Sequence, residues 1–158
     1  VNKKAVIQKI VESLQSELET YTRAAKASHA EATAEENRAE NKYDTRGLEA
    51  SYLATGQANK VAELEEAIEA FSDLKSKSFD DSPIDVGALV ELDQDGEKAF
   101  YFIGPSAGGT EVNESGHEVL VITPQSPLGS QLQGRQSAEQ LELSMAGAKQ
   151  QIEVVSVC

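Results

Sequence analysis

The sequence predicts an α+β protein, with an N-terminal antiparallel helical hairpin followed by a small, mostly antiparallel sheet that carries one short helix. Residues 4–75 contain no proline and only two glycines, and apolar residues recur in them at helical spacing. After residue 83, short runs of β-branched and aromatic residues alternate with glycine-containing turns. The expected domains are a coiled-coil finger over residues 1–75, a linker over 76–83 and a sheet domain over 84–158.

Two apolar stripes in the helical part alternate steps of three and four residues, as in the seam of a coiled coil. They comprise Ile7, Ile10, Leu14, Leu18, Tyr21 and Ala25, and then Ala54, Gln57, Val61, Leu64, Ile68 and Phe71. Antiparallel pairs from Ile7 with Phe71 to Tyr21 with Gln57 share a midpoint at residue 39. The sequence therefore predicts a hairpin whose turn lies near residues 38–40.

The seam residues become smaller toward this turn, where Ala25, Ser28, Ala32 and Ala39 replace the larger side chains of the base. Small residues let two helices approach closely, but each layer then buries little apolar area. We therefore expect the distal half of the hairpin to be narrow and only marginally stable.

The segment around the predicted turn is acidic and holds no aliphatic residue larger than alanine. Its carboxylates are Glu35, Glu36, Glu40 and Asp44. One interpretation is a solvated helix end whose carboxylates pair with nearby arginine and lysine side chains. The other is the tip of a finger that presents oxygen ligands to a metal ion. Asn37 and Asn41 suit turn or cap positions, because asparagine favours helix ends over helix interiors.

The second domain begins after a polar segment that ends at Pro83, a residue that terminates helices. Ser126–Gly134 reads as a short helix with serine at the N-cap, proline at the first position and glycine after the end. We expect a glycine-rich loop over residues 104–116. Strands are expected at residues 86–92, 99–103, 119–122, 141–143 and 152–157.

The charge balance restricts the possible partners. The formal net charge is −13, and residues 76–158 carry 4 basic against 13 acidic side chains. This excess argues against a broad phosphate-binding surface and favours a basic protein surface as partner.

A lone cysteine, Cys158, excludes an internal disulfide, and no apolar run is long enough to span a bilayer. We therefore expect a cytoplasmic protein with no membrane partner. His29 and His117 are expected to be surface histidines.

Several segments resemble the Gre family of bacterial transcription elongation factors. The run VLVITPQSPLGSQLQGR (residues 119–135), LEL (141–143) and the ending IEVVSV (152–157) resemble that family's strand, Ser-Pro-leucine helix and final strands. The segments DVGALVEL and FYFIGP resemble its first two strands. The resemblance covers essentially the whole chain and implies a coiled-coil finger followed by an FKBP-like domain.

The resemblance also implies a function. A Gre-type factor binds bacterial RNA polymerase, inserts its tip through the secondary channel and stimulates the polymerase's own cleavage of backtracked RNA. The protein would then not be an enzyme, would meet the nascent RNA 3′ end only within the polymerase complex, and would be a monomer. The implied docking residues are Ser126, Pro127, Leu128 and Gly129.

No cofactor is expected on the isolated chain. The resemblance implies that Glu36 and Glu40 share the Mg²⁺ of the polymerase active centre only in the complex, since a hard cation prefers oxygen ligands. The implied tip residues are Glu36, Asn37, Glu40, Asn41 and Asp44.

The tip departs from the family's Gly-Asp-x-x-Glu-Asn-x-Glu-Tyr pattern. Alignment on Glu40 and Asn41 puts Asn37 at the position of the metal-directed aspartate, and alignment on Tyr43 puts Ala39 at the glutamate position. The alternative is therefore a Gre-like competitor that occupies the same channel without promoting cleavage. A generic coiled-coil adaptor is a third possibility.

A peptidyl-prolyl isomerase is a more distant alternative, suggested only by the FKBP-like fold. That activity requires an aromatic-lined pocket, and strand alternation places Tyr101 on the face opposite Phe100 and Phe102. We do not expect it.

Overall fold

The computed structural model describes residues 1–33, 46–74 and 77–158. Its elements are α1 (Lys3–Thr33), α2 (Arg46–Ser72), β1 (Leu89–Gln94), β2 (Glu97–Ile103), β3 (Glu111–Glu114), β4 (His117–Ile122), α3 (Pro127–Leu132), β5 (Gln140–Met145) and β6 (Ala148–Val157). All the predicted helices and strands are present, with bounds that differ by a few residues. The predicted turn near residues 38–40 lies outside the described residues.

The chain divides into two compact units. One comprises Val1–Ser13 together with Glu69–Cys158, and the other comprises Leu14–Ile68. This division differs from the boundary expected at residue 75, because the beginning of α1 and the end of α2 belong with the sheet. The physical reason is that apolar residues at these helix ends are fully buried in the first unit, as described below.

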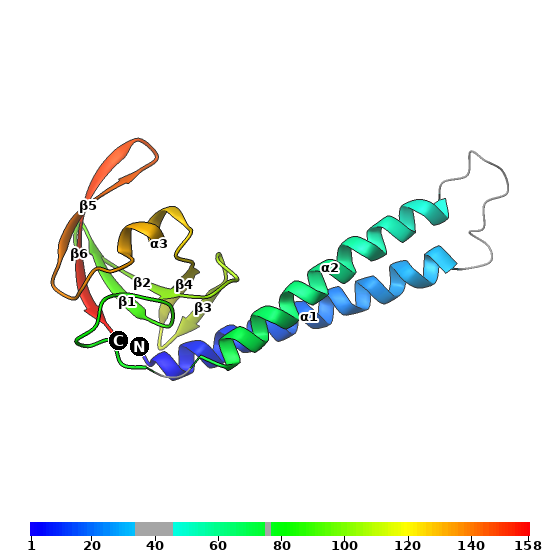
Figure 1. Ribbon diagram of the computed structural model, residues 1–158, viewed down its shortest axis with the longest axis horizontal. Helices are drawn as coiled ribbons and strands as arrows, with labels where there is room; N and C mark the ends of the chain where they lie inside the picture. The colour runs from blue at the N-terminus through cyan, green and yellow to red at the C-terminus, as the bar shows by residue number, and fades with distance from the viewer. Residues whose placement is uncertain (34–45, 75–76) are drawn as a thin grey trace. The chain divides into compact units, whose positions relative to one another are not determined.

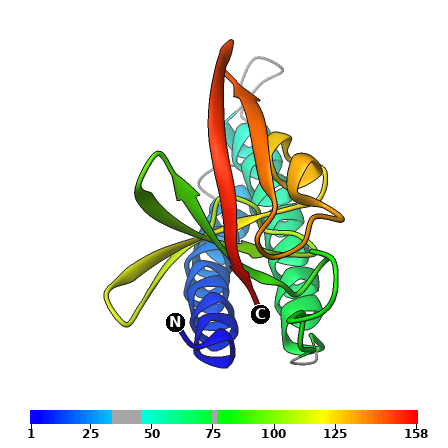
Figure 2. The same ribbon diagram turned by 90° about the vertical axis from the view of Figure 1, so that its left-hand side faces the viewer.

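In the unit Leu14–Ile68, α1 and α2 run side by side in opposite directions (Figures 1 and 2). The Ser28 hydroxyl donates to the Gln57 side-chain oxygen at 3.0 Å. The Lys60 ammonium lies 5.9 Å from the centre of the Tyr21 ring. The predicted antiparallel pairing is confirmed for this unit.

The predicted register of the two helices is wrong by a few residues. The midpoint of the residue numbers lies between 42 and 43 for the Ser28–Gln57 pair, and between 40 and 41 for the Tyr21–Lys60 pair. The predicted midpoint was residue 39. Gln57 therefore faces Ser28 and not Tyr21. Where seam residues are small, apolar spacing discriminates poorly between registers, whereas a polar pair within the seam specifies one.

The sheet has six strands in the order β3-β4-β2-β1-β6-β5. Four neighbouring pairs are antiparallel, as predicted, and β2 runs parallel to β4. Strand β3 lies in the segment expected to be a glycine-rich loop, and it pairs with β4 at the sheet edge. It escaped prediction because it has four residues and three of them are polar, a composition typical of loops.

Three of the hairpins close through the same kind of two-residue turn. Asp95-Gly96, Ser115-Gly116 and Ala146-Gly147 each have two consecutive residues with positive φ, between 51° and 90°. This is the backbone of a type I′ turn, whose twist matches that of the flanking strands. Glycine at the second position adopts this conformation without strain, which fixes the β1–β2, β3–β4 and β5–β6 pairings locally.

One face of the sheet carries the main hydrophobic core. The strand residues in it are Val90, Leu92, Ile103, Ile122, Leu141, Leu143, Ile152 and Val154. Helix α3 adds Leu128 and Leu132, and the segment before β1 adds Phe79 and Ile84. Figure 1 shows α3 lying over this face. The alternation of buried and exposed residues along β6 is that expected of a strand with one covered face.

Buried residues on the opposite sheet face lie beside the helix ends of the same unit. Phe71, near the end of α2, packs against Phe102 with ring centres 6.1 Å apart. A side chain at Gly104 would meet the Phe71 ring at 2.7 Å, so glycine is required there for close approach. Val6 and Ile10 of α1 are fully buried. The helix ends are therefore anchored by apolar packing, which sequence periodicity alone did not reveal.

Candidate functional site

The four residues implied as a docking site form the beginning of α3, at the end of the loop after β4. Ser126 is the N-cap residue, and its hydroxyl accepts from the Gly129 N–H at 3.0 Å and donates to the Thr123 carbonyl at 2.7 Å. Pro127 occupies the first turn, where a missing N–H costs nothing. The capped short helix predicted from sequence is confirmed.

The fold itself uses two of these four residues, Leu128 and Gly129. Leu128 is only 7% exposed and belongs to the core. A Cβ atom at Gly129 would lie 1.9 Å from the Thr123 carbonyl oxygen, so no larger residue fits there. Pro127 is exposed, and so is the neighbouring Ser130. A partner that approaches this helix would therefore touch Pro127 and Ser130, while Leu128 and Gly129 hold the helix in position.

The five predicted tip residues, Glu36, Asn37, Glu40, Asn41 and Asp44, all lie outside the described residues. Their roles therefore stay predictions.

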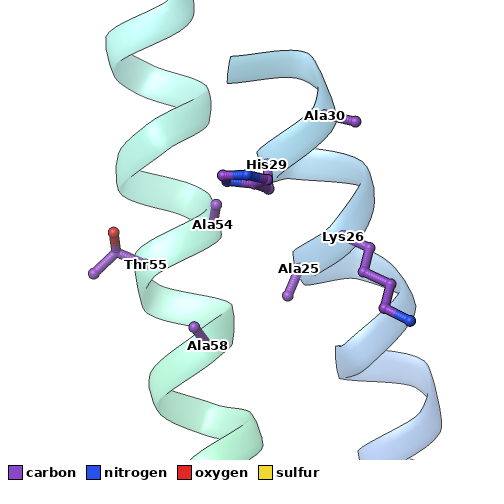
Figure 3. A pocket seen from close by; sticks show the side chains of 7 residues that line it. All are labelled: Ala25, Lys26, His29, Ala30, Ala54, Thr55 and Ala58. Carbon is purple, nitrogen blue, oxygen red and sulfur yellow. The ribbon is translucent and has the colours of Figure 1, made fainter. Parts of the chain in front are cut away.

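The two helices of the hairpin leave an open groove between them in the distal part that the structure describes (Figure 3). Its volume is about 450 Å³, and its lining is Ala25, Lys26, His29, Ala30, Ala54, Thr55 and Ala58. Figure 3 shows the His29 ring directed toward Ala54 across the groove. Small side chains from both helices make up most of the lining of this surface groove. His29 is exposed, as predicted.

The beginning of α1 is attached to the β3–β4 hairpin by hydrogen bonds that sequence analysis missed. The backbone N–H of Asn2 donates to the Glu114 carboxylate at 3.0 Å. The Lys9 ammonium donates to the Asn113 carbonyl at 2.7 Å. These contacts join residues more than 100 positions apart, and no local sequence signal identifies such a pair.

Glu114 is buried, with 8% exposure. Its carboxylate remains charged because hydrogen-bond donors stabilise the ionised form. The Asn2 N–H is the main cause that lowers the pKa of this carboxyl group, and the Ser115 hydroxyl adds to the effect. The Ser115 bond is 2.7 Å long. A buried carboxylate with two hydrogen-bond donors is a stable attachment point for the N-terminal residues of the chain.

Among the described residues, no group of three or more His, Cys, Asp or Glu side chains is placed to hold a metal ion. His29 and His117 belong to different compact units. The His117 ring lies 4.9 Å from that of Phe100. In the described part of the chain, no helix is long and apolar enough to cross a membrane.

The aromatic residues of β2 do not line one pocket. Tyr101 packs against the main core, whereas Phe102 is fully buried against Phe71 on the other face. The alternation predicted from sequence is confirmed, and the arrangement offers no support for an isomerase site.

The described residues define an α+β protein with a long helical hairpin and a mixed sheet, on which a Ser-Pro cap begins a short helix. No family model matches the chain, and no curated protein matches it. Solved structures that are similar include the GreA factor homolog 1 (Gfh1) protein of Thermus thermophilus, 23% identical over 94% of each chain with a TM-score of 0.39.

Two further solved structures are similar to this chain. Gfh1 of Thermus aquaticus is 23% identical over 98% of this chain and 94% of its own, with a TM-score of 0.40. The prokaryotic transcription elongation factor GreA/GreB from Nitrosomonas europaea is 19% identical over 73% of this chain and 94% of its own, with a TM-score of 0.36. Similarity at these identities and TM-scores does not assign the chain to a family.

Proposed function

We propose that the protein is a transcription elongation factor that binds bacterial RNA polymerase through the secondary channel and stimulates cleavage of backtracked RNA. The observation that supports the proposal is the combination of a helical hairpin, an acidic segment between its two helices, and the capped helix within the Gre-like run of residues 119–135. Helix α1 has 31 residues, which corresponds to a length of about 45 Å. A helix of this length can carry its end deep into a large enzyme.

The chemistry requires little of the factor itself. In a two-metal phosphodiester hydrolysis, one ion activates water and the other stabilises the leaving group. Carboxylates from a partner complete the coordination of a weakly held Mg²⁺, since this ion binds through few protein oxygens and keeps several waters. Glu36 and Glu40 are our candidates for this role, with Asn37, Asn41 and Asp44 beside them. The hydrolysis remains the polymerase's own reaction.

A cleavage assay on a purified backtracked elongation complex with 3′-extended RNA and Mg²⁺ tests this proposal. We expect the protein to shorten the transcript and the Glu36→Gln/Glu40→Gln variant to reduce the rate at least about tenfold, a loss equivalent to about 1.4 kcal/mol in the barrier. Glu65→Gln/Glu69→Gln is the matched control, since these are also four residues apart and exposed. It should cleave at the unsubstituted rate.

A second candidate function is competition for the same channel without cleavage. The observation that favours it is Asn37, which stands where the Gre pattern has a metal-directed aspartate. Under this alternative the protein alone leaves the transcript intact, blocks a known cleavage factor, and gains cleavage when Asn37→Asp is introduced. A protein that neither cleaves nor competes would refute both candidates.

A further inference from the structure

An open surface pocket lies where the beginning of α1, the segment before β1 and the residue after β6 meet, within one compact unit. Its volume is about 420 Å³. Its lining residues are Asn2, Lys3, Lys4, Lys77, Ser78 and Cys158. Half of the lining is therefore lysine, in a chain that has only 14 lysine and arginine residues and a net charge of −13. Such a concentration of positive charge is unusual for this composition.

Two of the three ammonium groups share one aromatic ring. The Phe79 ring is buried, and its centre lies 4.9 Å from the Lys3 ammonium and 5.2 Å from the Lys77 ammonium. Lys3 also donates a hydrogen bond to the Lys77 carbonyl. Cation–π attraction to this ring keeps both ammonium groups near the pocket. In the described part of the chain, neither ammonium forms an ion pair with a carboxylate.

The Lys3 ammonium is short of compensating negative charge. Burial is the main cause that lowers its pKa, and the negative charge of the Asp80 carboxylate opposes this effect only in part. Asp80 accepts a hydrogen bond from the Ser78 hydroxyl at 2.6 Å. A partly desolvated cation with so little compensation favours an anion from solution as its partner.

The beginning of helix α1 also borders the pocket. Helix α1 begins at Lys3, and the first N–H groups of a helix have no carbonyl within the helix to bond. The Asn2 side chain accepts from the Ala5 N–H at 3.1 Å and so satisfies one of them. The macrodipole of a long helix favours an anion close to this end, and the Glu114 carboxylate, which accepts from the Asn2 N–H, already lies there.

We propose that this pocket binds a small oxyanion of the phosphate class, either free or as the phosphate group of a small metabolite. The lysine ammonium groups supply charge-assisted hydrogen bonds, and the volume admits an ion as large as diphosphate. The strongly negative chain disfavours a long polyanion such as RNA, because the rest of its surface repels further phosphates. The proposal is independent of the proposed function in transcription.

Isothermal titration of the full chain with inorganic diphosphate in chloride buffer tests the proposal. We expect Lys3→Gln and Lys77→Gln each to weaken binding about tenfold, because each removes one charged contact. Asp80→Asn should strengthen binding a few-fold by removing a nearby negative charge. Lys98→Gln is the matched control, because Lys98 is exposed and paired with Glu91, and it should leave the affinity unchanged. Absence of binding, or equal weakening by Lys98→Gln, would overturn the proposal.

Two further titrations with the same variants separate the possible sources of the phosphate group. Binding of glycerol phosphate with the same loss in Lys77→Gln would assign the pocket to phosphorylated metabolites as well as free ions. Tighter binding of an RNA oligonucleotide than of diphosphate would replace the proposal with a nucleic-acid contact.

The thiol of Cys158 reports on the pocket directly, since it is the only cysteine in the chain. Alkylation by iodoacetamide should slow several-fold when diphosphate is present, because an occupied pocket excludes the reagent. Lys77→Gln should abolish this protection while its far-ultraviolet circular dichroism stays unchanged. Binding of diphosphate without any protection of Cys158 would place the ion elsewhere and refute the site.

Discussion

At the residue scale, Gly129 shows how one missing side chain positions a helix. The Thr123 carbonyl oxygen occupies the space that a Cβ atom at residue 129 would take, 1.9 Å away. Because the same carbonyl accepts from the Ser126 hydroxyl, neither it nor the cap can move without loss of a hydrogen bond. The glycine is therefore required by a close approach and not by an unusual backbone angle.

We expect Gly129→Ala to lower the free energy of unfolding of the sheet unit by about 1–3 kcal/mol, the usual cost of overpacking. Urea unfolding followed by circular dichroism measures this change. Gly108→Ala is the control, because a Cβ there would make only an ordinary contact of 3.4 Å with Thr123. It should change the stability by less than about 0.5 kcal/mol. Equal effects of the two substitutions would contradict this account.

At the element scale, Glu114 attaches the beginning of α1 to the β3–β4 hairpin. Its pKa is lowered in the folded state, first by the Asn2 N–H and then by Ser115, so the ionised form is the one that the fold stabilises. A lowered folded pKa contributes stability above the ordinary carboxyl pKa and loses it as the pH falls through the folded value. The attachment is therefore complete at neutral pH and is released only in acid.

An acid titration by nuclear magnetic resonance tests this attachment. The amide proton of Asn2 should shift as Glu114 is protonated, with a midpoint below the ordinary carboxyl range. Glu114→Gln should remove this transition, and Glu118→Gln, an exposed substitution on β4 of the same hairpin, should leave it in place. A midpoint at the ordinary carboxyl value would show that the Asn2 bond does not stabilise the charged form.

Helix and strand predictions differed in how well local sequence supported them. The Ser126-Pro127 cap and the Asp95-Gly96 turn were correct because each depends on backbone preferences within a few residues. Strand β3 was missed because its pairing to β4, and not its own composition, makes it a strand. The helix register was wrong because the Ser28–Gln57 hydrogen bond determines it where the apolar pattern is thin.

At the scale of the whole molecule, the two compact units differ in how much they bury. The buried residues that the structure describes in Leu14–Ile68 are Leu14, Ser28, Leu64 and Ala67. The other unit contains the sheet core together with Val6, Ile10 and Phe71. Because buried apolar area supplies most of the stability of a fold, the distal hairpin has much less to hold it closed.

Hydrogen exchange should therefore reveal two levels of protection. We expect amides in residues 18–33 and 53–63 to exchange through local opening, well before those of β1, β2 and β6, which should open only with global unfolding. Exchange followed by mass spectrometry resolves the two classes. Equal protection of helices and sheet would mean that the two units unfold as one.

The sequence by itself determined the features that depend on neighbours along the chain: the helical hairpin, the capped short helix, the β-hairpins and their turns. The acidic tip with Glu36 and Glu40 is likewise a prediction from sequence. The tertiary structure alone decided the parallel β2–β4 pair, the helix register, the burial of Phe71 against Phe102 and the meeting of Lys3 with Lys77 at Phe79. Such contacts join residues far apart in sequence. The periodicity of apolar residues indicates which face of a helix or strand is buried, but not which element packs against that face.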